Sequence, residues 1–116
     1  MSASALFIIE SDPRRGGRPA EAVRLAAGVG AWKKVEVAVY LRGAAVLLLG
    51  ENAESLVDGE HYTRYLPLLR ELDCQVRVQK GAAALGQLGQ AALPFQQISD
   101  GQLAVMAAGR DCVLRF

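Results

Sequence analysis

The feature that most constrains the fold is an alternation of short strand-like runs with longer segments whose apolar residues recur at helical spacing. The first run, Leu6–Ile9, is continuously apolar, which is typical of a central strand covered on both faces. Helices between consecutive strands require parallel crossovers, which are right-handed almost without exception. The pattern therefore predicts an α/β fold, a three-layer α/β/α sandwich with a mainly parallel sheet of about five strands, formed by Leu6–Ile9, Val35–Tyr40, Gln75–Val78, Phe95–Ile98 and Val113–Phe116.

Two helices are recognised by a favourable start and an apolar stripe. One begins near Pro19, which suits a first helical turn, and the other is capped by Ser99 or Asp100. Their stripes are expected to face the sheet and consist of Ala22, Val23, Leu25, Ala26 and Val29 in the first helix and Leu103, Met106 and Ala107 in the second.

Other segments are less decisive. Ala44–Leu49 could be a strand or a short buried helix, and we favour the helix because glycines flank it. Glu51–Gly59 is polar and is predicted to be a mobile loop, whereas Ala82–Leu88 is predicted to be a short helix. Glu60–Leu72 has helical spacing but contains Pro67, so this helix is either kinked there or begins near residue 65.

Composition fits one globular domain spanning residues 1–116. Apolar residues make up 52% of the chain, enough for a sizeable core, and the net charge of +1 gives no argument for nucleic acid. The apolar start is too short for a signal peptide or a membrane span, so we expect a cytoplasmic protein without membrane contact. With a single histidine and no metal-binding spacing, neither a metal nor a cofactor is expected.

In an open parallel sheet, ligands bind beyond the carboxyl ends of the strands, here in the loops after Glu10, Tyr40, Val78 and Ile98. A basic, glycine-rich loop follows the first strand and could hold an anion through guanidinium groups and amides. A second short loop, after the third strand, also opens a predicted helix. The candidate ligand-binding residues are Arg14, Arg15, Gly16, Gly17, Arg18, Gln79, Lys80 and Gly81, and the alternative for both loops is an ordinary solvated surface.

The two cysteines, Cys74 and Cys112, each precede a predicted strand. Both thiols should therefore lie at the amino ends of the strands, away from the edge where ligands bind. Since free cysteine is often buried as a small apolar residue, we expect both to pack in the protein, with a reactive thiol as the alternative.

Four stretches, ALFIIESDP, PAEAVRLAAG, VEVAVYLRGAAVLLL and the ending ISDGQLAVMAAGRDCVLRF, together resemble the DsrE/DsrF-like family over nearly the whole chain. The resemblance implies a compact α/β/α domain that forms cytoplasmic oligomers, typically trimers or hexamers. It also implies, for the sulfur-relay members, a cysteine just after the third strand that carries sulfur as a persulfide. The matching position here is Gln79, or Lys80 in a register shifted by one, and neither side chain can take up sulfur.

The sequence thus favours a DsrE-like binding or assembly subunit of intracellular sulfur relay, without the usual nucleophile and without a catalytic residue of its own. It would form homo-oligomers, with sulfur-relay proteins as further partners. Candidate apolar surfaces for assembly are Trp32 and Ala44–Leu49. Two alternatives stay open: a sulfurtransferase or sulfur carrier that uses Cys74 or Cys112, and a small-anion or nucleotide binder.

Overall fold

A single five-stranded sheet forms the centre of the protein, whose computed structural model describes residues 3–116. The strand order is β4-β3-β2-β1-β5, and every neighbouring pair is parallel. The strands are β1 (Ala3–Ile9), β2 (Val35–Leu41), β3 (Gln75–Gln79), β4 (Gln96–Ile98) and β5 (Cys112–Arg115). The predicted parallel sheet of about five strands is therefore confirmed.

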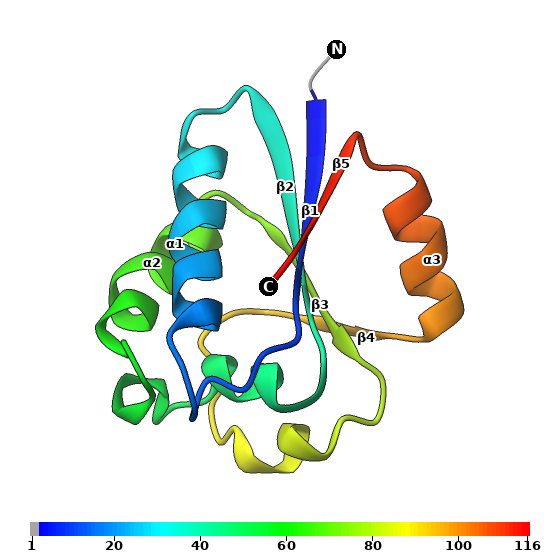
Figure 1. Ribbon diagram of the computed structural model, residues 1–116. Helices are drawn as coiled ribbons and strands as arrows, with labels where there is room; N and C mark the ends of the chain where they lie inside the picture. Colours follow the sequence, from blue (N-terminus) through cyan, green and yellow to red (C-terminus); the bar gives the residue numbers. More distant parts are fainter. Residues whose placement is uncertain (1–2) are drawn as a thin grey trace.

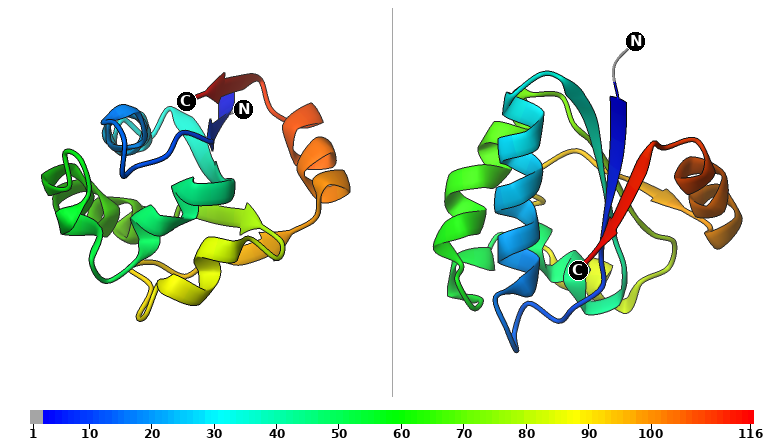
Figure 2. Two further views of the ribbon diagram at one scale, coloured as in Figure 1. Left: turned by 60° about the horizontal axis from the view of Figure 1, so that its bottom comes forward. Right: turned by 45° about the horizontal axis from the view of Figure 1, so that its top comes forward.

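Helices cover both faces of the sheet, as Figure 1 shows. Helices α1 (Arg18–Ala31) and α2 (Glu60–Glu71) pack together on one face, and α3 (Asp100–Ala108) lies on the other. The first three crossovers extend the sheet in one direction from β1, whereas the crossover through α3 carries the chain to the opposite side of β1 (Figure 2). These layers confirm the α/β/α sandwich.

The sequence predicted that the continuous apolar runs are strands covered on both faces. In the structure both faces of the central strands are buried. In β1, Phe7 and Ile9 face the core under α1 and α2, while Leu6 and Ile8 face the smaller core under α3. All four side chains are at most 1% exposed. Tyr40 of β2 belongs to the smaller core and is also fully buried.

The connections that follow β2 and β3 contain short 3₁₀ helices. The helix favoured for residues 44–49 is the 3₁₀ helix η1 (Gly43–Leu49), and the predicted helix at 82–88 is the shorter 3₁₀ helix η3 (Ala83–Gln87). Within the predicted loop 51–59, residues Ala53–Ser55 form the 3₁₀ helix η2. Helix α2 runs unbroken from Glu60 through the exposed Pro67, so it does not begin near residue 65.

The prediction that residues 44–49 form an apolar surface for assembly is wrong. Four of its six side chains, Ala45, Val46, Leu48 and Leu49, are at most 1% exposed because η1 turns them into the larger core. Trp32, by contrast, is 67% exposed at the end of α1. Across residues 3–116, no helix is long and apolar enough to span a membrane.

Candidate functional site

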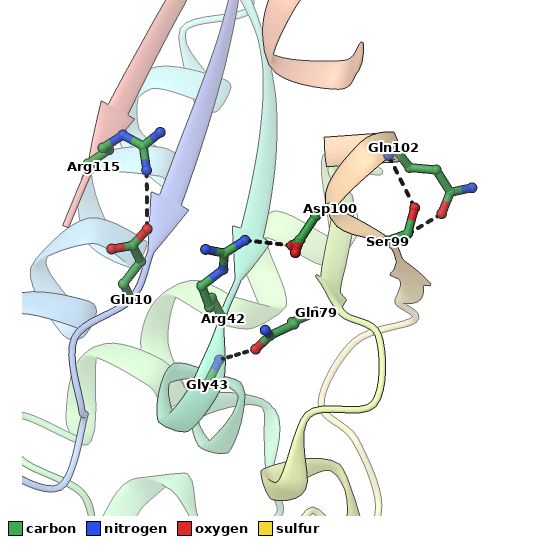
Figure 3. Close-up of polar contacts among 8 residues, drawn as sticks. All are labelled: Glu10, Arg42, Gly43, Gln79, Ser99, Asp100, Gln102 and Arg115. Atoms are coloured by element: carbon green, nitrogen blue, oxygen red, sulfur yellow. Dashed lines mark hydrogen bonds and ion pairs between the residues drawn. The ribbon is translucent and has the colours of Figure 1, made fainter. Parts of the chain in front are cut away.

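Charged and polar side chains gather where the strands end, and Figure 3 shows them at the carboxyl edge of the sheet. We call Glu10, Arg42, Gln79, Asp100 and Arg115 the carboxyl-edge cluster. Arg115 Nη1 lies 3.1 Å from Glu10 Oε1, and Arg42 Nη2 lies 2.8 Å from Asp100 Oδ1. Its two acids and two bases therefore compensate each other, and the pairs are exposed enough for solvent to weaken them.

Gln79 ends β3 and ties this strand to the neighbouring turn. Its Oε1 accepts a hydrogen bond of 3.0 Å from the backbone N–H of Gly43, where φ is +59°. The amide of Gln79 therefore has a structural role in positioning η1. A cysteine side chain at this position would be shorter and could not make the same contact.

The start of α3 is closed by a capping box, which confirms Ser99 as the cap. The N–H of Gln102 donates to Ser99 Oγ at 3.2 Å, and the N–H of Ser99 donates to Gln102 Oε1 at 2.8 Å. Since these bonds satisfy two backbone donors, the helix start presents Asp100 toward Arg42 rather than an open anion site.

Arg42 also contacts the end of β2 beneath it. Its guanidinium carbon lies 5.7 Å from the centre of the Tyr40 ring, and polar contact with the Tyr40 hydroxyl raises the pKa of Arg42. Neither that hydroxyl nor Arg42 Nε has a hydrogen-bond partner of good geometry among the residues described. Arg42 is therefore held by its stacking on the ring and by Asp100.

The three arginines between β1 and the start of α1 already contact other groups of the protein. Arg14 donates to Asp12 through Nε and Nη2, at 3.0 and 2.8 Å, and these bonds lower the pKa of Asp12 to about 2. Arg18 donates to the carbonyl of Arg115 at 3.3 Å and lies over the Phe116 ring. Arg15 Nε lies 3.7 Å from Asp12 Oδ2, and the side chain of Arg15 is 87% exposed.

The two predicted ligand-binding segments occupy separate parts of the edge. Gly17 packs against the side chain of Asp58, whereas the N–H of Gly81 donates to Gln97 Oε1 at 3.1 Å. Helix η1 lies between residues 14–18 and residues 79–81 in the views of Figures 1 and 2. Lys80 is exposed, and its backbone N–H donates to the carbonyl of Ile98 at 3.0 Å. Each segment thus belongs to its own surface region.

Cys74 lies at the amino edge, at the other end of β3 from Gln79. The five-residue separation corresponds to roughly 16 Å along a strand. Cys74 Sγ donates to the carbonyl of Val37 at 3.3 Å, and burial raises the pKa of this thiol to about 11. Because the thiolate is the nucleophilic form, Cys74 is poorly suited to carry sulfur near neutral pH, although it borders a cavity of about 370 Å³.

The expectation that both thiols are packed is wrong for Cys112, which is exposed. It begins β5, pairs with Ala5 and is exposed, because β5 is an edge strand. Its predicted place at the amino end of a strand is nevertheless confirmed. The structure therefore leaves Cys112 as the accessible thiol of the two.

We expect alkylation of the native protein at pH 8 to label Cys112 and to leave Cys74 unmodified until the chain is unfolded. The physical reason is that Cys112 is exposed, whereas Cys74 is half-buried with a pKa of about 11. Intact mass spectrometry of the native protein, with Cys112→Ser as the control, measures the labelling. Rapid native labelling in Cys112→Ser would contradict the expected inertness of Cys74.

The carboxyl edge was expected from the strand pattern, but most members of the cluster were not. Arg42, Asp100, Glu10 and Arg115 were missed because each looks like an ordinary loop or strand-end charge in the sequence. Their only signal is that each directly follows or ends a strand, or begins the helix after one. Among residues 3–116, no group of histidine, cysteine and acidic residues could hold a metal ion.

Comparison with known proteins gives a structural relative. No family model matches the sequence, and no curated protein matches it. The structure is similar to the crystal structure of the YchN protein from E. coli, with a TM-score of 0.82, 16% sequence identity and complete coverage of both chains. At this identity the similarity establishes a shared fold.

Proposed function

We propose that the chain is a DsrE-like binding or assembly subunit of intracellular sulfur relay that lacks the persulfide-carrying cysteine. The fold supports this proposal, because the chain matches over its full length YchN, a protein of DsrE-like fold. The position of Gln79 supports the second part of the proposal, that the persulfide-carrying cysteine is lacking. Gln79 ends β3 at the carboxyl edge, where the family resemblance puts the sulfur-carrying cysteine.

Two further observations favour binding over sulfur chemistry. Cys74 lies at the opposite edge with a raised pKa, and Cys112 begins an edge strand, also at the amino end of the sheet. The carboxyl edge instead presents paired charges, which suit recognition of a polar partner surface more than covalent catalysis.

The test is to supply the missing thiol. In a Cys112→Ser background, Gln79→Cys is expected to gain one sulfur atom from a sulfane-sulfur donor, reversibly by dithiothreitol, whereas Cys112→Ser alone gains none. Intact mass measures the gain. If Cys112→Ser alone takes up sulfur, Cys74 is a carrier and the proposal fails. If Gln79→Cys gains none, position 79 is not equivalent to the family's sulfur site.

Self-assembly is the second part of the proposed role, with the trimer or hexamer that the resemblance implies. Helix α3 supports it, because none of its residues is fully buried and Val105 is 77% exposed. The adjacent edge strand β5 adds Val113 and Leu114, each more than one third exposed. Apolar side chains of this kind on an exposed helix and edge strand suit an interface between copies.

We expect light scattering to find the native protein as a trimer or hexamer and Val105→Glu as a smaller species, since a charge in an apolar interface opposes association. Val57→Glu, at an exposed apolar position on another part of the surface, is the matched control and should leave the mass unchanged. A monomeric native protein, or equal masses for all three, would contradict the assembly role.

A further inference from the structure

A cavity of about 300 Å³ lies beside the first turns of α2, apart from the carboxyl-edge cluster. Segment 50–54 and residues 90 and 92 form its other walls. Its volume is at the lower end of the range for small-molecule sites. The cavity is therefore large enough for a compact organic ligand.

The floor of the cavity is formed by two nearly buried side chains of α2. Tyr62 and Leu66 are 2% and 3% exposed, and both line the cavity from α2. The Tyr62 hydroxyl is buried without a hydrogen-bond partner among the described residues. Burial, aided by the charge of Asp58, raises the pKa of Tyr62 above its ordinary value, so the group stays neutral. Because this oxygen is enclosed by protein atoms, Tyr62 offers a ligand in the cavity its ring and not a hydrogen bond.

The rim of the cavity is acidic. Glu51 and Glu54 are exposed, and no basic residue is among those that line the cavity. Neither carboxylate forms an ion pair with any residue in the described part of the chain. Glu51 Oε2 accepts a hydrogen bond of 3.3 Å from the backbone N–H of Gln90, which holds this carboxylate at the rim. The rim therefore favours a positively charged group.

Pro67 adds a hydrogen-bond acceptor to the same wall. Proline has no N–H to donate, so the carbonyl of Thr63, four residues earlier in α2, lacks its usual helical partner. Thr63 and Pro67 both line the cavity and are exposed. The wall thus combines a free backbone acceptor with the two carboxylates of the rim.

The geometry points to a binding site for an organic ammonium group on an apolar stem, with the stem over Tyr62 and Leu66 and the charge between Glu51, Glu54 and the Thr63 carbonyl. The ammonium group supplies the donors that these acceptors lack, and the apolar stem covers the floor. Such a group occurs on a free small amine and on a lysine side chain. This site does not depend on the proposed sulfur-relay role.

The test compares probes of similar size and different charge by titration into the native protein, followed by backbone amide NMR shifts. We expect 2-phenylethylamine to bind at least about tenfold more tightly than 2-phenylethanol or 3-phenylpropanoate, because each ionic hydrogen bond is worth about a factor of ten. The shifts should centre on residues 50–54 and 62–67. Equal binding of amine and alcohol, binding centred elsewhere, or no binding of the amine would overturn the inference.

Substitutions of the two rim carboxylates test whether they bind the ammonium group of the ligand. The double substitution Glu51→Gln and Glu54→Gln should weaken amine binding about tenfold and leave the alcohol unchanged. Glu36→Gln, an exposed carboxylate on β2 outside this cavity, is the matched control and should have no effect. Unchanged amine binding in the double variant would also overturn the inference.

A second experiment distinguishes the two sources of the ammonium group and uses the blocked tripeptide acetyl-Gly-Lys-Gly-amide. Tighter binding of this peptide than of 2-phenylethylamine assigns the site to a protein lysine, and weaker binding assigns it to a free amine.

Discussion

Phe7→Ala is expected to lower the free energy of unfolding by about 3–5 kcal/mol, a large share of the stability of a domain of this size. Phe7 is 1% exposed in the central strand, so its removal leaves a cavity under α1. Its ring also stacks on Phe116, with 5.9 Å between the ring centres and an interplanar angle of 11°. The substitution therefore also loosens the end of the chain against the sheet.

Chemical denaturation followed by far-ultraviolet circular dichroism measures this loss. The matched control is Val57→Ala, because Val57 is apolar but 39% exposed and lies outside the proposed interface of α3 and β5. The control should cost less than about 1 kcal/mol. A loss in Phe7→Ala no larger than that in Val57→Ala would mean that the larger core is not centred on β1.

Gly59→Ala is expected to destabilise the protein by about 2–3 kcal/mol, although the backbone of Gly59 is helical and suits any residue. The reason is space. A β-carbon at residue 59 would overlap the backbone carbonyl of Glu54 and would lie 2.8 Å from that of Ala53. Backbone atoms cannot rotate away as a side chain can, so η2 must separate from the start of α2.

The control for this prediction is Gly28→Ala in α1, where a β-carbon would meet no atom within 4 Å. Because alanine favours a helix more than glycine does, this variant should gain about 0.5–1 kcal/mol. Denaturant midpoints of both variants give the comparison. Equal midpoints for Gly59→Ala and the native protein would show that η2 and α2 are not in close contact.

Much of the fold could be predicted because strand burial leaves a direct trace in the sequence. The apolar run at Leu6–Ile9 reflects two buried faces, and the cap at Ser99 marks the start of α3. The 3₁₀ turns were harder, because their short lengths carry little periodicity. Pro67 was ambiguous because a proline in an exposed position can remain within a helix when its neighbours pack well, as Leu66 and Leu69 do here.

The site was less predictable, since it depends on pairing between distant residues. The strand pattern indicated the correct edge, but the partnership of Arg42 with Asp100 joins residues 58 positions apart. The exposure of Cys112 was missed because the position of β5 at the sheet edge depends on the order of the strands, which the sequence does not determine. The acidic cavity beside α2 was not predicted either, because segment 50–54 and residue 90 meet only in the folded chain.

The most direct test of the central claim, that this chain has no dedicated sulfur-carrying cysteine, is the rate of sulfur uptake by the native protein. Intact mass after exposure to a sulfane-sulfur donor gives that rate, with Cys74→Ser, Cys112→Ser and free N-acetylcysteine measured in parallel. The account predicts no uptake at Cys74 and uptake at Cys112 no faster than in N-acetylcysteine, as for any exposed thiol. Uptake at Cys74, or uptake at Cys112 well above the rate of the free thiol, would contradict it and make that cysteine a carrier.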